Sequence, residues 1–200
     1  MAFNGLSGIS AKNEFQSLIW QLPEQVQQDL KDHKLQLVRD VIYGVKEIAA
    51  TSDNVKMFES GDRTARALCN IVQGRLEADT YYMVMGLRVR TAKFLTADDS
   101  TTLEALASKA VWTAPAANVA NGELTFGSGA TTYMDKMAAS IFDHDGTTEL
   151  KSGEYRIDGK VLKPQTELKV EFDLAKAPFT DSATRMLVRV DIEVVKTVKA

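Results

Sequence analysis

Apolar residues recur at every second position in three segments of the chain, residues 82–90, 168–174 and 186–194. In the second segment Leu168, Val170 and Phe172 alternate with charged residues, and in the third Val, Ile and Met positions do the same. A period of two predicts β-strands with one buried face and one wetter face. In the first segment the alternation predicts one face of Met83, Met85, Leu87 and Val89, and another of Tyr82, Val84, Arg88 and Arg90.

Shorter apolar runs predict further strands at 55–58, 123–126, 137–142, 155–157 and 161–162. Asp158-Gly159, between the last two runs, predicts a tight hairpin turn. Asn121-Gly122 and Asp145-Gly146 are similar turn signals. The chain from residue 78 onward is therefore expected to be rich in strands.

The segment 37–48 supports two interpretations. Leu37, Val41, Val45 and Ile48 have helical spacing, whereas its Val, Ile and Tyr residues favour a strand. Within 101–109, by contrast, a short helix is predicted with Leu103 and Leu106 on its inner side.

The N-terminal residues 1–34 predict an arm that contains short amphipathic helices. Phe15, Leu18, Ile19 and Leu22 form one apolar helical stripe, and Pro23 ends it and can open a second, mostly polar helix. Residues 35–200 are then expected to form a single β-rich domain, and 200 residues suffice for one such domain with a core.

Composition excludes several kinds of chemistry. One Cys cannot form an intrachain disulfide or a cysteine zinc cluster, and two His residues leave little material for a histidine metal site or triad. A net charge of −3 argues against direct nucleic-acid binding, which needs a basic patch or arm. No signal-peptide pattern and no apolar run of transmembrane length occur, so a soluble protein made in the cytoplasm is expected.

Charge is distributed unevenly. Residues 94–150 carry two lysines against eight acidic residues, net −6, whereas residues 151–200 carry ten basic against eight acidic residues, net +2. These two regions could meet across a subunit contact, or they could be solvated loops.

No candidate motif has the context that catalysis requires. Asp143-His144-Asp145-Gly146 resembles part of a calcium loop, but Ile141 and Ser152 stand where the full pattern needs acidic ligands. An acidic turn is predicted there, and ion binding by Asp143 and Asp145 stays open. Neither His33 nor His144 has a nucleophile signature beside it.

The remaining candidates also have structural interpretations. Cys69 lies among apolar residues and is expected to be a buried thiol. Gly127-Ser128-Gly129 predicts a hairpin tip rather than a phosphate cradle, and Asp98-Asp99 predicts a helix cap or loop. Lys56, Arg63, Arg66 and Arg75 form only a loose basic cluster, which Glu59 and Asp62 dilute. We therefore predict no enzyme, catalytic residue, cofactor or metal ligand.

Four segments resemble strands of the jelly-roll coat proteins of icosahedral bacterial viruses, the lipid-containing ones especially. Leu76 to Val89 is similar to an early strand, and Asn121-Gly122-Glu123-Leu124-Thr125-Phe126 is similar to a middle strand with the pattern N-G-x-L-x-[LF]. Residues 153–170 contain a strand, the Pro164-Gln165 turn and the next strand. The terminal strand 185–195 follows a loop that holds Pro178, and the resemblance covers roughly residues 76–196.

This resemblance implies a mainly β fold, a single jelly-roll β-sandwich of about eight antiparallel strands with the N-terminal helical arm, because 200 residues are too few for the family's double-barrel coats. It implies a structural virion protein that self-assembles into an icosahedral shell. Its partners would be copies of itself, other capsid proteins and, through the arm, an internal membrane surface, without direct nucleic-acid contact. The alternative is a β-sandwich module that binds a carbohydrate or a host surface. A cupin-like enzyme is disfavoured because it needs clustered histidines.

Overall fold

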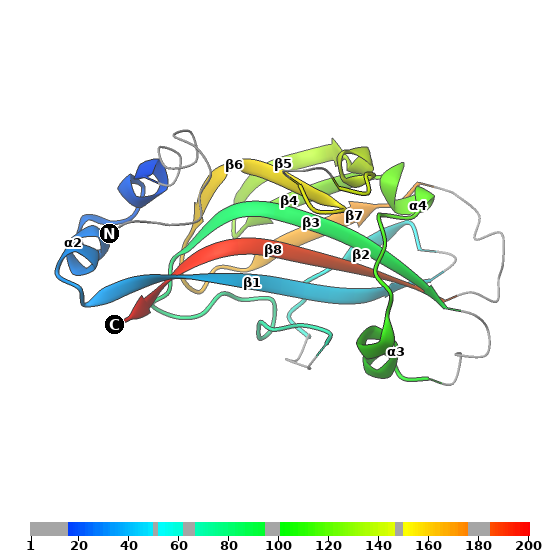
Figure 1. The fold of residues 1–200 in the computed structure, drawn as a ribbon, viewed down its shortest axis with the longest axis horizontal. Helices are drawn as coiled ribbons and strands as arrows, with labels where there is room; N and C mark the ends of the chain where they lie inside the picture. The colour runs from blue at the N-terminus through cyan, green and yellow to red at the C-terminus, as the bar shows by residue number, and fades with distance from the viewer. Residues whose placement is uncertain (1–15, 50–51, 62–66, 95–100, 147–149, 176–184) are drawn as a thin grey trace.

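Two four-stranded antiparallel sheets pack face to face in the computed structural model, which describes residues 16–49, 52–61, 67–94, 101–146, 150–175 and 185–200. We call the sheet of order β1-β8-β3-β6 the long sheet and the sheet of order β2-β7-β4-β5 the short sheet (Figure 1). The chain is thus mainly β and sandwich-like, as predicted. The strands are β1 (Leu35–Ile48), β2 (Asn54–Lys56), β3 (Tyr82–Phe94), β4 (Glu123–Ser128), β5 (Thr131–Ala138), β6 (Glu154–Leu162), β7 (Leu168–Asp173) and β8 (Arg185–Lys199).

Strand pairing is nested along the chain. The first strand pairs with the eighth, the second with the seventh, the third with the sixth and the fourth with the fifth. The further pairs β3–β8 and β4–β7 join these hairpin-like pairs into the two sheets. The described chain therefore runs like one long antiparallel hairpin that has been folded over itself.

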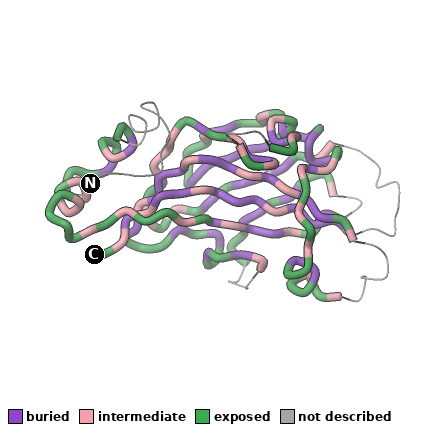
Figure 2. The backbone as a smooth tube through the Cα atoms, in the orientation of Figure 1, coloured by how far each residue is buried: buried purple, intermediate pink, exposed green. Residues whose placement is uncertain are grey.

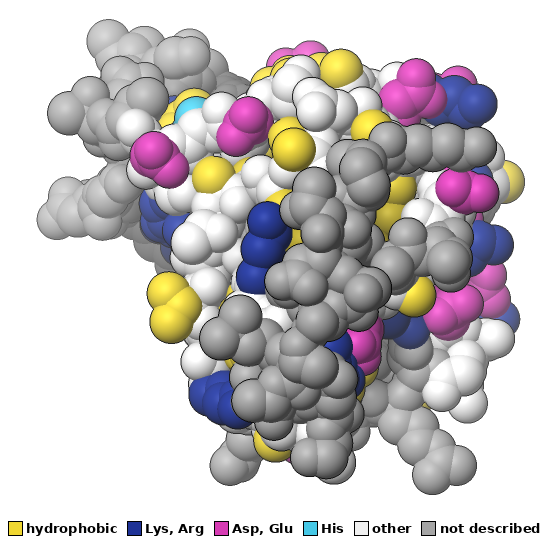
Figure 3. Space-filling view, turned by 90° about the vertical axis from the view of Figure 1, so that its right-hand side faces the viewer, with side chains coloured by type: hydrophobic (Ala, Val, Ile, Leu, Met, Phe, Trp, Pro, Cys, Tyr) yellow, Lys and Arg dark blue, Asp and Glu magenta, His cyan; other side chains and the backbone are white. Residues whose placement is uncertain are grey.

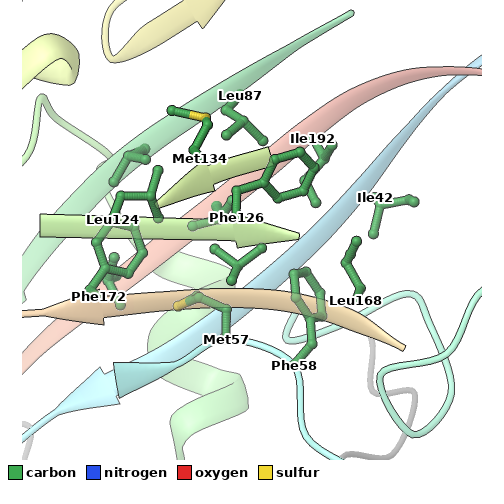
Figure 4. Close-up of a cluster of buried hydrophobic side chains, with 14 of the residues drawn as sticks. Ile42, Met57, Phe58, Leu87, Leu124, Phe126, Met134, Leu168, Phe172 and Ile192 are labelled. Carbon is green, nitrogen blue, oxygen red and sulfur yellow. The ribbon is translucent and has the colours of Figure 1, made fainter. Parts of the chain in front are cut away.

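The core lies between the two sheets. Phe126 and Phe172 of the short sheet are fully or almost fully buried, and the Phe126 ring lies beside Ile192 of the long sheet (Figure 4). Buried positions recur along the strands of both sheets in Figure 2. Burial of such large apolar side chains is the main favourable contribution to folding, about 25 cal/mol per Å².

The strongest alternation patterns are confirmed. In β7 and β8 the predicted apolar faces point into the core, and in β1 the strand interpretation of residues 37–48 is correct. All fourteen residues of β1 pair with β8. This long-range pairing satisfies the backbone of β1 and decides between its two possible local structures.

The predicted faces of residues 82–90 are correct for residues 87–90 and wrong for residues 82–85. The register of β3 shifts between Val84 and Gly86 against both neighbouring strands, as in a β-bulge. A bulge inserts an extra residue, so the alternation changes face there. Tyr82 and Val84 point into the core before the bulge and Leu87 and Val89 after it, whereas Met83 and Met85 lie on the outer face.

Two shorter predictions are also wrong. Asp158-Gly159 is no hairpin turn, because β6 continues through both residues. The predicted strand 137–142 covers the end of β5 and then a 3₁₀-helix, η2 (Ala139–Phe142). That helix buries Phe142, whose ring packs edge-on against Tyr155 with 6.0 Å between centroids.

Helical segments cover the two ends of the outer face of the long sheet. A helix at 16–20 and α2 (Glu24–Lys31) lie at one end, where Leu18 and Leu22 are buried against Met83 and Val195. The predicted helix at the other end is confirmed as α3 (Leu103–Lys109), capped by Thr102, and Leu106 packs there with Val45 and Leu187. A further short helix, α4 (Ala117–Ala120), precedes β4. Phe15 lies outside the described residues, and the arm role of residues 1–34 stays a prediction.

Candidate functional site

A charged cluster occupies the middle of the outer face, between the two helical covers. At its centre is Asp191 of β8, whose side chain is only 8% exposed. Its Oδ2 accepts a hydrogen bond from Nη2 of Arg90 on β3 at 2.5 Å, and its Oδ1 accepts one from Nε of Arg189 at 2.7 Å. Two guanidinium groups thus share one nearly buried carboxylate. Arg90 Nε is buried and has no hydrogen-bond partner among the described residues.

Two aromatic rings hold the cationic side of the cluster. The Arg189 guanidinium lies 4.8 Å from the centre of the Tyr43 ring and 5.9 Å from that of Trp112. Arg90 is 6.0 Å from the same Trp112 ring. Trp112 is positioned by its neighbour Thr113, which exchanges two backbone hydrogen bonds with Thr91 beyond the end of β6. Cation–π contacts of this kind stabilise a partly desolvated arginine.

Beside this cluster is an open hollow of about 410 Å³. Its lining includes Val41 and Tyr43 of β1, Arg88 of β3 and Asn70. Asn70 is fixed against the edge of β1, because its Oδ1 accepts the Tyr43 N–H at 2.8 Å and its Nδ2 donates to the Val41 carbonyl at 2.7 Å. The hollow is therefore lined by strand residues and, on one side, by the Asn70 side-chain amide, which two hydrogen bonds hold in place.

Each lining carboxylate has its own cation. Besides Asp191, Asp40 accepts from Lys196 at 2.8 Å and Glu193 accepts from Lys151 at 2.7 Å. Arg88 differs, since its Nε donates to the Ser152 carbonyl at 2.7 Å and no carboxylate of the described residues forms an ion pair with it. Burial, and then the nearby Arg90 charge, lower the pKa of Arg88.

The predicted acidic turn at 143–146 is held by its histidine. His144 Nδ1 accepts the Gly146 N–H at 3.1 Å, and Nε2 lies 2.8 Å from the Glu154 carbonyl. These contacts assign the neutral ring with its proton on Nε2. Within the described ranges no three His, Cys, Asp or Glu side chains gather closely enough to hold a metal ion.

The other candidates do not come together in one site. Cys69 is buried as predicted, and its Sγ donates to the Ile71 carbonyl at 3.3 Å. His33 lies exposed after α2 in the left-handed region, with φ 58°. The predicted hairpin at 127–129 is found between β4 and β5, where Gly127 and Ser128 end β4 and Gly129 lies in the turn.

The two described members of the loose basic cluster, Lys56 and Arg75, both form ion pairs. Arg75 pairs with Glu167 at 2.8 Å and Lys56 with Glu171 at 3.7 Å. Arg63, Arg66 and Asp98-Asp99 lie outside the described residues. In Figure 3, which looks onto the right-hand end of Figure 1, basic and acidic side chains are interspersed over the visible described surface.

The residues of the charged cluster were predicted only as wetter strand positions. Arg88, Arg90, Arg189 and Asp191 do lie opposite apolar faces in the sequence, but nothing there shows that β3 and β8 are neighbours. Four charged residues on the outer faces of two strong strand patterns are the signal that could have suggested a site.

Comparison with known proteins does not identify the chain. No protein-family model matches it, and a search of curated proteins found no match. None of the described helices is long and apolar enough to span a membrane. Function is therefore inferred from the fold and from the outer face of the long sheet.

Proposed function

We propose that the protein is a jelly-roll capsid subunit that self-assembles into the icosahedral shell of a virus. The nested pairing of eight strands carries this proposal. Strand orders 1-8-3-6 and 2-7-4-5 are those expected when a long hairpin folds into two Greek keys, the jelly roll of viral capsid proteins, lectins and cupins. Among these classes, the resemblance of residues 76–196 to coat proteins of bacterial viruses favours the capsid.

Copies of the same chain are the proposed partners, with other capsid proteins beside them. A closed shell needs repeated contacts between identical surfaces. Trp20 is 79% exposed, although Leu18 and Leu22 of the same segment are buried on the long sheet. Large exposed tryptophans are frequent anchors of protein interfaces. We therefore place the contact of the N-terminal arm, with a neighbouring subunit or an internal membrane, at Trp20.

The state of assembly tests the shell proposal. The purified full-length chain should form large symmetric particles in negative-stain images, or an oligomer whose population rises with concentration in sedimentation velocity. A monomer at every concentration would contradict the shell role.

The arm contact has its own matched test. Trp20→Ser should weaken assembly or, where the contact is to lipid, abolish flotation with neutral phospholipid vesicles. Gln21→Ser, at the neighbouring exposed position, should change neither. Normal behaviour of Trp20→Ser in both measurements would exclude Trp20 as the contact and leave the shell proposal standing.

A ligand- or receptor-binding module is the second candidate function, and the hollow on the long sheet favours it. Binding sites for small molecules are typically concave, with a few placed polar groups. A monomer that binds a saccharide at this hollow would support the module over the shell subunit.

A further inference from the structure

Arg88 is the cation of the hollow that has no carboxylate partner among the described residues. The three lining carboxylates are taken by Lys196, Lys151 and the Arg90–Arg189 pair. Glu154 is opposite Arg88 in the β3–β6 register, but it is buried, and its Oε2 accepts the Lys151 N–H at 2.9 Å. Among the cations that line the hollow, Arg88 is therefore the one that forms no ion pair with the described residues.

The two terminal nitrogens of the Arg88 guanidinium, the pair that can bind both oxygens of an anion, form no hydrogen bond with the described residues. Only its Nε is engaged, with the Ser152 carbonyl. Its two terminal nitrogens form no hydrogen bond with the described residues and are not sealed from solvent. Two parallel N–H groups of an arginine match the two oxygens of a carboxylate. Burial and then the nearby Arg90 charge lower the pKa of Arg88, whereas the charges of Asp191, Glu154 and Glu193 raise it. A bound anion would act in the same direction as these carboxylates.

The surrounding charges select a singly charged anion. Asp40, Asp191 and Glu193 all line the same hollow, so a doubly charged phosphate would meet three carboxylates there. A carboxylate brings one negative charge, which one arginine balances. The charge pattern thus favours a carboxylate over a phosphate.

The size and the neutral groups of the hollow favour a ligand that also carries hydroxyls. About 410 Å³ is more than a bare carboxylate fills and lies in the range of small-molecule pockets. The Tyr43 hydroxyl forms no hydrogen bond with the described residues, and Asn70 Nδ2 uses one of its two hydrogens. Lys151 and Glu193, an exposed pair at the rim, can exchange partners with ligand hydroxyls.

We infer that this hollow binds an acidic monosaccharide, with Arg88 pairing its carboxylate and Tyr43 and Asn70 contacting its hydroxyl groups. The inference rests on the second candidate function, ligand binding, and does not depend on shell assembly. Particle formation and saccharide binding are measured separately, so the failure of either proposal can be recognised.

Calorimetric titration of the full-length chain with glucuronate tests the inference, with glucose and acetate as matched probes that lack the carboxylate or the ring. Glucuronate should bind at least about tenfold more tightly than either probe. Arg88→Gln should weaken glucuronate binding by about tenfold or more, because it removes the charged fork. Arg75→Gln, at an exposed arginine paired with Glu167, should leave the affinity unchanged.

A second variant covers the case in which Arg88→Gln does not fold. Tyr43→Phe keeps the ring against Arg189 and removes only the hydroxyl. It should therefore weaken the binding of glucuronate several-fold and leave the affinity for acetate unchanged. The inference is overturned if glucuronate does not bind, if acetate binds equally well, or if folded Arg88→Gln binds like the wild type. It is also overturned if Arg88→Gln abolishes self-association while no saccharide binds, because the carboxylate would then come from a neighbouring copy.

Discussion

Leu18 occupies the space that a β-carbon on Gly159 would need. An ideal Cβ at Gly159 would lie 2.6 Å from both terminal methyl groups of Leu18, which is fully buried. The glycine in β6 therefore forms the notch through which the helix at 16–20 packs on the long sheet. Asp158-Gly159, which suggests a turn in the sequence, thus lies within a strand, and its glycine makes room for a helix that is distant in the chain.

Gly159→Ala should loosen the N-terminal helices while the sandwich core stays folded. Overpacking of this kind costs about 1–3 kcal/mol. Thermal unfolding should show the loss, and hydrogen exchange should increase first in residues 16–31. Gly61→Ala, where an added Cβ meets nothing within 4 Å, is the control and should have little effect.

Leu18→Ala and Gly159→Ala should be strongly non-additive. The first variant alone should cost about 2–5 kcal/mol, since it removes a buried leucine. In that background the alanine at 159 finds space, so its own cost should largely disappear. Additive free energies of unfolding in a double-mutant cycle would show that the two positions do not contact each other.

Gly153→Ala should be one of the most damaging small substitutions. Gly153 has φ +71°, and an added Cβ would lie 2.1 Å from the Val89 carbonyl oxygen, a backbone atom. Gly129→Ala separates the effect of the positive φ from the effect of the clash. Gly129 also has a positive φ, +57°, but the nearest atom to an added Cβ would be 3.7 Å away. We expect about 1–2 kcal/mol at Gly129 from backbone conformation alone and a clearly larger loss at Gly153. If chemical denaturation shows that the two variants lose equal free energies of unfolding, a clash between the added Cβ and the Val89 carbonyl oxygen is excluded.

Asp191→Ala should destabilise the protein by about 3–5 kcal/mol, because it leaves Arg90 and Arg189 partly buried without their counter-ion. The Trp112 fluorescence should change too, since both arginines contact that ring. Glu167→Ala removes the exposed partner of Arg75 and should cost at most about 1 kcal/mol. A loss at Asp191 no greater than at Glu167 would contradict the importance of the buried pair.

The Glu47–Arg185 pair should make stability depend on acidic pH. Arg185 donates to both carboxylate oxygens of Glu47 at 2.7 Å, and this hydrogen bonding lowers the pKa of Glu47 below its ordinary 4.5. Its stabilisation is therefore present above pH 4.5 and is lost as pH falls through the lowered pKa.

Glu47→Gln should consequently cost up to about 1 kcal/mol at neutral pH, since the pair is partly exposed. The gap between variant and wild type in free energy of unfolding should narrow as the pH falls below 4.5. Glu123→Gln, at an exposed glutamate of β4, is the control. If the difference in free energy of unfolding between Glu47→Gln and the wild type stays constant with pH, the charge on Glu47 does not contribute to stability.

The sequence by itself determined which side of the most regularly alternating strands faces the core. In β7 and β8 every second residue is apolar and faces the core between the sheets, so the periodicity identifies the core face without knowledge of the neighbours. Cys69 and the helix that begins after Thr102 were predictable for similar local reasons, an apolar surrounding and a capping residue.

Only the tertiary structure decided the rest, because those features depend on residues far apart in the chain. The bulge in β3 is defined by its register against β6 and β8, and Gly159 is explained by Leu18. The charged cluster joins Arg90 to Asp191 across 101 positions of sequence. Periodicity reports which face of a strand meets water on average, whereas pairing partners and covering helices decide which outward charges become buried together.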